Sequence, residues 1–115
     1  MLSVPEQIHL LLNYYTLGIK KIYGNNLRSV ILYGSYARGD YNTDSDQDIM
    51  ILVDLLDEQI ISTRQKISDF TYNFNMRHNL NIVPMVKSEK HFNYWKDAHP
   101  FYKNINKEGI MLYEA

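Results

Sequence analysis

The N-terminal part of the chain has the hydrophobic pattern of an amphipathic helix. Ser3-Val4-Pro5-Glu6 matches a capping box, and Gly24-Asn25-Asn26 ends the pattern. Between them, apolar residues recur three and four positions apart: Ile8, Leu11, Leu12, Tyr15, Ile19 and Ile22. This spacing places them on one helix face and predicts a helix over about 4–23.

Two segments with the character of β-strands follow this helix. Residues 29–33 are mainly branched or aromatic and end at Gly34, which predicts a first strand. Residues 48–53 are almost continuously apolar after Asp48. A strand of that kind is covered on both faces, so we expect it to be central in a sheet.

The next part of the chain predicts a longer helix and a third strand. Helical spacing over about 57–77 is carried by Ile60, Ile61, Ile67, Phe70 and Phe74. Residues 80–86 form the strand. Pro84 cannot donate a ladder hydrogen bond, so this strand should lie at an edge of the sheet or contain a bulge.

Short elements are predicted for the C-terminal part. Ser88-Glu89 can cap a helix that runs to about residue 96. Pro100 can begin another helix, which Gly109 ends. Residues 110–113 suit a short strand or a tail.

The composition limits the classes of protein that fit. With 115 residues and 45% hydrophobic content, we expect one compact domain over 1–115. The chain has no cysteine, no basic region ahead of an N-terminal apolar stretch, and no apolar run near the roughly 18 residues that span a bilayer. A cytoplasmic location and no membrane association are the simplest expectations. The net charge of -1 gives no positive field that would attract bulk nucleic acid.

Two short motifs carry candidate chemistry. Gly34-Ser35 follows a predicted strand, where backbone N–H groups and a hydroxyl can face an anion and the missing side chain of Gly34 allows close approach. Such a pair alone is most often an ordinary turn. Asp46 and Asp48 are two residues apart at the start of a strand, so both side chains lie on one face. Two carboxylates there suit Mg²⁺, which also binds nucleotide phosphates.

Together these motifs resemble a known signature. Gly34-Ser35, ten intervening residues and Asp46-Gln47-Asp48 resemble the motif of the minimal nucleotidyltransferases, within the DNA polymerase β-like nucleotidyltransferase superfamily. The order of predicted elements is also similar, over roughly residues 5–86. The resemblance implies an α/β fold of the polymerase β palm type, with a small mixed sheet of about three to four strands flanked by helices.

The resemblance also implies an activity and the residues for it. Members transfer a nucleoside monophosphate, with AMP from ATP as the expected case, to an acceptor hydroxyl and release pyrophosphate. By position, Gly34 and Ser35 would hold the triphosphate, and Asp46 and Asp48 would hold Mg²⁺. Arg38 would either contact a phosphate or pair at the surface with a nearby aspartate, Asp40 or Asp44.

The third carboxylate of the family is missing from its usual strand. Residues 79–86 contain no Asp or Glu. Asn81 can offer only a neutral carbonyl, and Asp54 lies about 20 Å of strand beyond Asp48. Glu89 is a downstream acid that the fold could bring in. We therefore expect nucleotide binding to survive better than catalysis.

Three functions remain open from the sequence. The first is an Mg²⁺-dependent enzyme whose acceptor is a tyrosine of a small helical HEPN-type toxin, which would make the chain an antitoxin. The second is a module of the same fold that binds a nucleotide or a partner without catalysis. The third is an unrelated α/β domain, which predicts that Asp46 and Asp48 point apart or into solvent.

Overall fold

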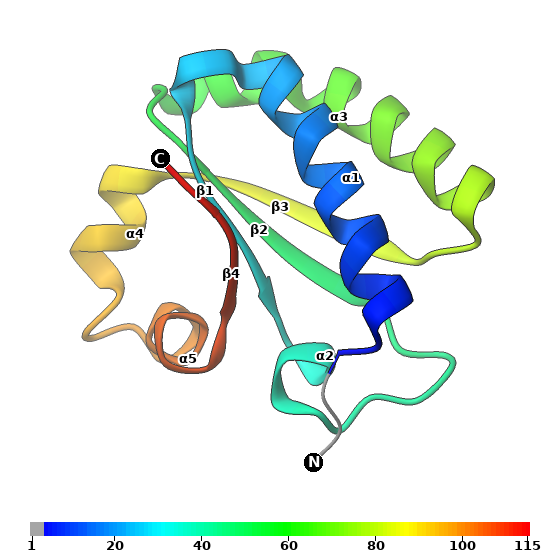
Figure 1. Ribbon diagram of the computed structural model, residues 1–115. Coiled ribbons are helices and arrows are strands. Elements are labelled where there is room, and N and C mark those ends of the chain that lie inside the picture. The colour runs from blue at the N-terminus through cyan, green and yellow to red at the C-terminus, as the bar shows by residue number, and fades with distance from the viewer. Residues whose placement is uncertain (1–3) are drawn as a thin grey trace.

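A four-stranded mixed sheet forms the centre of the computed structural model, which describes residues 4–115 (Figure 1). Its order is β3-β2-β1-β4. The strands are β1 (Leu27–Tyr33), β2 (Gln47–Val53), β3 (Ile82–Ser88) and β4 (Ile110–Glu114). β1 is antiparallel to both β2 and β4, and β3 is parallel to β2. The mixed sheet and the central second strand are confirmed, and residues 110–113 belong to a strand.

Helices cover both faces of this sheet (Figure 1). One face carries α1 (Glu6–Tyr23) and α3 (Asp57–His78), and the other carries α4 (Glu89–Trp95) and α5 (Pro100–Glu108). Two short elements flank β1: the 3-10 helix η1 (Gly24–Asn26) and the helix α2 (Ser35–Arg38). Within residues 4–115, no helix combines the length and apolar character needed to cross a membrane.

The predicted helices agree with the structure to within a few residues at each end. The largest difference is at α1, which begins at Glu6 with Pro5 as its N-cap. Proline is suited to the start of a helix because its missing N–H would be unpaired there in any case. Ser3 of the predicted capping box lies outside the described residues.

Alternating side chains of the sheet build two apolar layers. Toward α1 and α3 the sheet presents Val30, Leu32, Ile49, Ile51 and Val53, and toward α4 and α5 it presents Ile31, Met50 and Leu52. Each fully buried aliphatic side chain contributes about 1.5–3 kcal/mol. The hydroxyls of Tyr15 and Thr71, 2.7 Å apart, join α1 to α3 inside the first layer. Both faces of β2 are therefore covered, which explains its continuous apolar run.

The outer edge of β3 is partly blocked, and Pro84 belongs to this arrangement. The N–H of Gln47 donates to the carbonyl of Asn81 at 3.0 Å, so by alternation the nitrogen of Pro84 points away from β2, where no ladder bond is lost. The amide of Asn75 accepts from the N–H of Ile82 at 2.9 Å and donates to its carbonyl at 3.1 Å. The prediction of an edge strand is confirmed.

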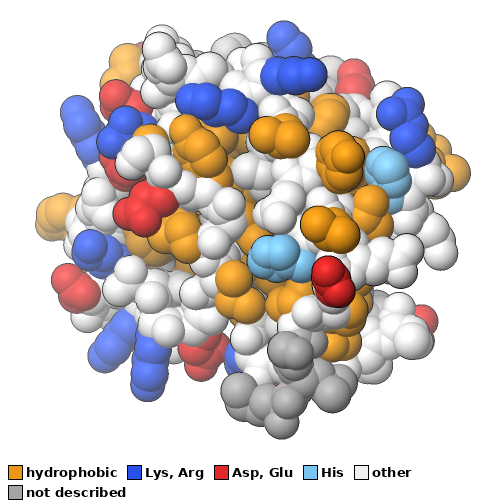
Figure 2. Space-filling view, viewed as in Figure 1, with side chains coloured by type: hydrophobic (Ala, Val, Ile, Leu, Met, Phe, Trp, Pro, Cys, Tyr) orange, Lys and Arg blue, Asp and Glu red, His pale blue; other side chains and the backbone are white. Residues whose placement is uncertain are grey.

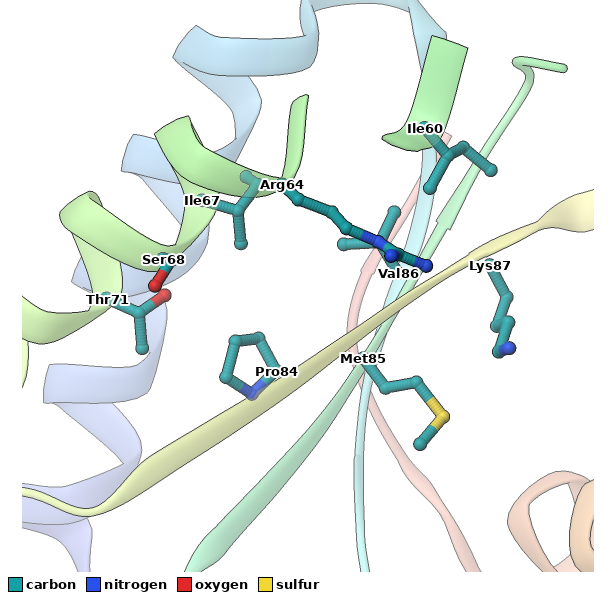
Figure 3. A pocket seen from close by; sticks show the side chains of 9 residues that line it. All are labelled: Ile60, Arg64, Ile67, Ser68, Thr71, Pro84, Met85, Val86 and Lys87. Atoms are coloured by element: carbon teal, nitrogen blue, oxygen red, sulfur yellow. The ribbon is translucent and has the colours of Figure 1, made fainter. Parts of the chain in front are cut away.

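A hollow of about 430 Å³ lies between α3 and this edge (Figure 3). Pro84 points toward α3, Lys87 points to the other side of the strand, and the side chain of Arg64 extends from α3 over β3 beside Val86. No carboxylate lines this hollow. Its side chains therefore offer no donor set for a metal ion, and the candidate chemistry lies elsewhere.

Loss of the Asn75 amide should destabilise the fold. We expect Asn75→Ala to lower the free energy of unfolding by about 1–3 kcal/mol, because two backbone groups of Ile82 lose their partner. Urea denaturation measures this. Asn73→Ala, an exposed position on the same helix, is the control and should change stability by less than about 0.5 kcal/mol. Equal effects of the two substitutions would contradict the role of the amide.

Candidate functional site

A tight turn at Gly34 brings β1 and β2 into close contact. Tyr33, the last residue of β1, pairs with Asp48 in β2, and Gly34 follows with φ of 77°. A Cβ added to Gly34 would lie 3.3 Å from Cγ of Asp48 and would overlap its Oδ2 atom. Both the positive φ and this contact require glycine. The turn thus holds the backbone of Gly34 directly against a carboxylate.

Ser35 begins α2 immediately after this turn. The N–H of Arg38 donates to the carbonyl of Gly34 at 3.1 Å, and Gly39 ends the helix in the left-handed region with φ of 81°. At the tip of the loop that returns to β2, two backbone N–H groups donate to side chains. Asn42 N–H donates to Oγ of Ser45 at 2.9 Å, and Asp44 N–H donates to Oδ1 of Asn42 at 2.8 Å.

Gln47 fixes the register of the two acids. Its buried side chain accepts from the N–H of Asn81 at 2.8 Å, and it belongs to the opposite face of β2 from its neighbours. Asp46 and Asp48 therefore share the face that α4 and α5 cover in part. Asp48 is half-buried and Asp46 is exposed.

The local charges act on Asp48. Burial, and secondly the charge of Asp46, raise the pKa of the Asp48 carboxyl above its ordinary value, while Arg38 opposes the shift. Arg38 also forms an exposed ion pair, with its Nε 3.2 Å from Oδ2 of Asp40. Such exposed pairs are weak. The surface pairing expected as one role of Arg38 is therefore present with Asp40, and the same side chain reaches the site.

A cavity of about 390 Å³ collects most of the predicted site residues. Gly34, Ser35, Arg38 and Asp48 line it, whereas Asp46 stands outside its lining. Its other walls are residues that the sequence did not indicate: Tyr33, Phe101, Asn104, Ile105 and Glu108. The rings of Tyr33 and Phe101 meet edge to face at 5.8 Å, so α5 closes one side. No local motif marks these α5 residues, because only the packing of α5 on β1 brings them there.

No carboxylate of β3 completes the site. Val83 pairs with Asp48 across the parallel ladder and is 45% exposed. Asn81 comes directly before Ile82, the partner of Gln47, and its side chain is uncharged. Within residues 4–115, no group of three or more His, Cys, Asp or Glu side chains could hold a metal ion.

The expectation that Glu89 could supply the third acid is wrong. Glu89 follows Ser88, which pairs with Val53 at the far end of β2, and its Oε1 lies 3.5 Å from Nε of Arg28. The same argument confirms that Asp54, which comes directly after Val53, is remote from Asp48. Glu108, which lines the cavity beside Asp48, is the downstream acid that the fold does bring near.

Two carboxylates of this kind fit a nucleotide-bound Mg²⁺ ion. The donors are hard oxygens, and a cation would stabilise the ionised form of Asp48, whose pKa is raised first by burial and second by the charge of Asp46. Mg²⁺ is commonly held by one or two carboxylates together with substrate phosphates and water. The position that a Cβ on Gly34 would take is filled by the Asp48 carboxyl, so only glycine lets this carboxylate lie against the turn.

A comparison of two glycines can separate the effect of the contact between Gly34 and Asp48 from the effect of backbone strain. Gly24 also has a positive φ, 58°, but a Cβ there meets no atom within 4 Å. We expect Gly24→Ala and Gly34→Ala each to cost about 1–2 kcal/mol of strain. Only Gly34→Ala should displace the Asp48 carboxyl and change its titration, measured by carbon-detected NMR. Similar titration of Asp48 in both variants would contradict the close contact.

The raised pKa of Asp48 predicts a pH-dependent gain in stability when its charge is removed. Ionised Asp48 destabilises the folded state above its raised pKa, and this penalty fades as pH falls toward the ordinary value of 3.8. In metal-free buffer at pH 7, Asp48→Asn should raise Tm by about 2–4 °C. The gain should vanish below about pH 3.8. Asp44→Asn, an exposed loop control, should change Tm little, and a pH-independent gain for Asp48→Asn would refute the electrostatic cause.

Comparisons with known proteins show the family of this chain. The family model described as "Polymerase beta, Nucleotidyltransferase" matches residues 18–115. Two proteins of Methanocaldococcus jannaschii are similar in sequence. The one named "Putative protein adenylyltransferase MJ0604" is 35% identical over 95 residues, which is 83% of this chain and 87% of that protein. "Putative protein adenylyltransferase MJ0141" is 37% identical over 68 residues, 59% of this chain and 67% of that protein.

Solved structures share the fold at lower identity. "A putative nucleotidyltransferase from Sulfolobus solfataricus" aligns with a TM-score of 0.66 at 22% identity, over 94% of this chain and 81% of that one. A structure described as "toxin-antitoxin with AMP-PNP" aligns with a TM-score of 0.57 at 17% identity, over 90% and 73%. The family match overturns the reading as an unrelated α/β domain. The chain belongs to the polymerase β-type nucleotidyltransferase family.

Proposed function

We propose that this chain is an Mg²⁺-dependent adenylyltransferase that moves AMP from ATP to a hydroxyl group of another protein. The observation that carries the proposal is the backbone of Gly34 held against Asp48 at the cavity that Ser35 and Arg38 also line. The family match and the relatives named as protein adenylyltransferases support it.

Each predicted residue has a physical role in this proposal. The Gly34 turn lines the cavity that would take the triphosphate, and the Ser35 hydroxyl and Arg38 guanidinium there contact its oxygens. Asp46 and Asp48 would hold Mg²⁺, which supplies positive charge to the phosphate oxygens. Phe101 and Asn104 of α5 border the same cavity and limit how the nucleotide can lie.

The reaction is a displacement at the α-phosphorus of ATP. The acceptor oxygen forms a new bond to this phosphorus, the bond from it to the oxygen that bridges to the β-phosphorus breaks, and pyrophosphate leaves. The acceptor must also lose its proton. Since Val83 and not a carboxylate lies beside Asp48, β3 provides no base there, and the proton passes to solvent or to Glu108, which lines the same cavity.

The lack of a base on β3 favours a phenolic acceptor. A tyrosine hydroxyl has a pKa of about 10, well below that of an aliphatic alcohol, so it needs less help to ionise. We therefore propose a protein tyrosine as the acceptor. A toxin of the helical HEPN type is the proposed partner, and the structural similarity to proteins described as toxin-antitoxin complexes supports this choice.

A second candidate function is a nucleotide-binding module without turnover. The exposed Val83 at the position beside Asp48 is the observation that favours it. Both functions predict binding of Mg²⁺-ATP, so they differ only in release of pyrophosphate and transfer of label.

The test is transfer of label from α-³²P-ATP to the protein encoded by the neighbouring gene, which the proposal expects to be of the HEPN type. We expect Mg²⁺-dependent labelling of one tyrosine with equal release of pyrophosphate. Asp48→Asn should reduce it at least about 100-fold, because the ion loses a charged ligand. Asp44→Asn, which removes an exposed loop carboxylate outside the cavity, should leave it unchanged.

Placing an acid on β3 distinguishes the proposed enzyme from the module that binds a nucleotide without turnover. Val83→Asp and Asn81→Asp each put a carboxylate on the face of Asp48, and we expect one of them to raise turnover about tenfold or more. Binding of Mg²⁺-ATP without labelling in the wild type or in either variant would contradict the enzyme and leave the module. Failure of Mg²⁺-ATP to bind would contradict both.

A further inference from the structure

A second feature lies on the opposite face of the sheet from Asp48, where α1 and α3 form a groove of about 720 Å³. Its apolar walls are Leu11, Tyr14, Leu17, Phe70 and Phe74. Figure 2 shows hydrophobic side chains gathered over α1 and α3, with Lys and Arg side chains along the upper border. No residue of the proposed nucleotide site lines this groove.

The floor of the groove is fixed by a close helix contact. A Cβ on Gly18 would overlap the ring of Phe70, so only glycine lets this ring lie against the backbone of α1. The same ring packs on Tyr15 at 5.3 Å and on Phe74 at 5.9 Å between centroids. These contacts hold the aromatic floor in place, and the groove is therefore formed before any partner arrives.

Large apolar side chains stand exposed along its α1 wall. Tyr14 is 66% exposed and Leu17 is 60% exposed, and Leu10, one turn earlier on the same helix face, is 55% exposed. Positions 10, 14 and 17 cover about 10 Å of helix. A contiguous apolar patch rimmed by polar residues is typical of a protein-binding surface.

The border of the groove is entirely basic. Lys20, Lys21, Arg77 and His78 line it, and no Asp or Glu does. Lys20 is engaged, since its Nζ donates to the carbonyl of Gly24 at 3.0 Å and lies over the ring of Tyr113. Lys21 and Arg77 form no ion pair with any residue in 4–115. They are available to carboxylates of a partner.

This charge pattern decides between two occupants. A second copy of the chain would meet the groove about a two-fold axis, which sets basic border against basic border. Like charges in that position cost binding energy. A groove between two packed helices has the shape of a site for a third helix. We propose that it binds an amphipathic helix of a partner protein whose apolar face is bordered by Asp and Glu.

The test uses two fluorescent helical peptides with the same leucine stripe, one bordered by Glu and the other by Lys. Anisotropy titration should show the acidic peptide binding at least about tenfold tighter, with the difference shrinking at high salt. Lys21→Glu combined with Arg77→Glu should reverse the preference, and Leu17→Ser should weaken both peptides. Lys66→Glu combined with Lys107→Glu, the same charge change at exposed positions outside the groove, should leave the preference intact.

Three results would overturn the proposal. One is equal binding of the two peptides, and another is a preference that the Lys66 and Lys107 control reverses as well. The third is a wild-type dimer in sedimentation that Leu17→Ser dissociates, because a second copy would then be the occupant. Asp48→Asn should not alter peptide binding. The peptide test is therefore independent of whether the proposed catalytic function is correct.

Discussion

The close approach of Gly34 to Asp48 is the constraint on which the rest of the candidate site depends. It exists because β1 and β2 pair antiparallel with Tyr33 opposite Asp48, and because Gly34 then turns with a positive φ. Apolar layers on both faces of β2 hold this register, since a slip by one residue would bury Asp48 and expose Ile49. The hydrophobic core thus fixes the distance between the turn and the carboxylate.

The two faces of the sheet have different consequences for function. On the face of α4 and α5, the cavity beside Asp48 lies near the residue where β2 begins, with α5 as one wall. On the other face, α1 and α3 bury the side chains of β1 and β2 and expose their own outer sides. A nucleotide and a partner helix can therefore be bound at the same time without competing for the same residues.

Local chemistry could be predicted from the sequence, whereas contributions from distant elements could not. The spacing between Gly34-Ser35 and Asp46-Gln47-Asp48 can be read from the sequence. Alternation of side chains along a strand places Asp46 and Asp48 on one face, so these residues could be identified directly. Pro84 indicated an edge strand for the same local reason. The walls from α5 depend on how that helix packs on the sheet, and the distance of Glu89 from the site depends on the parallel pairing of β3 with β2. No short-range pattern encodes that packing.

The central claim is that Asp46 and Asp48, beside the Gly34 turn, hold a divalent ion that arrives with ATP. Paramagnetic broadening of backbone amide signals by Mn²⁺, measured with and without ATP, tests it most directly. The account predicts strong broadening centred on residues 34–35 and 46–48 only when ATP is present, and its loss in Asp48→Asn. Broadening centred elsewhere, or the same broadening without ATP, would contradict it.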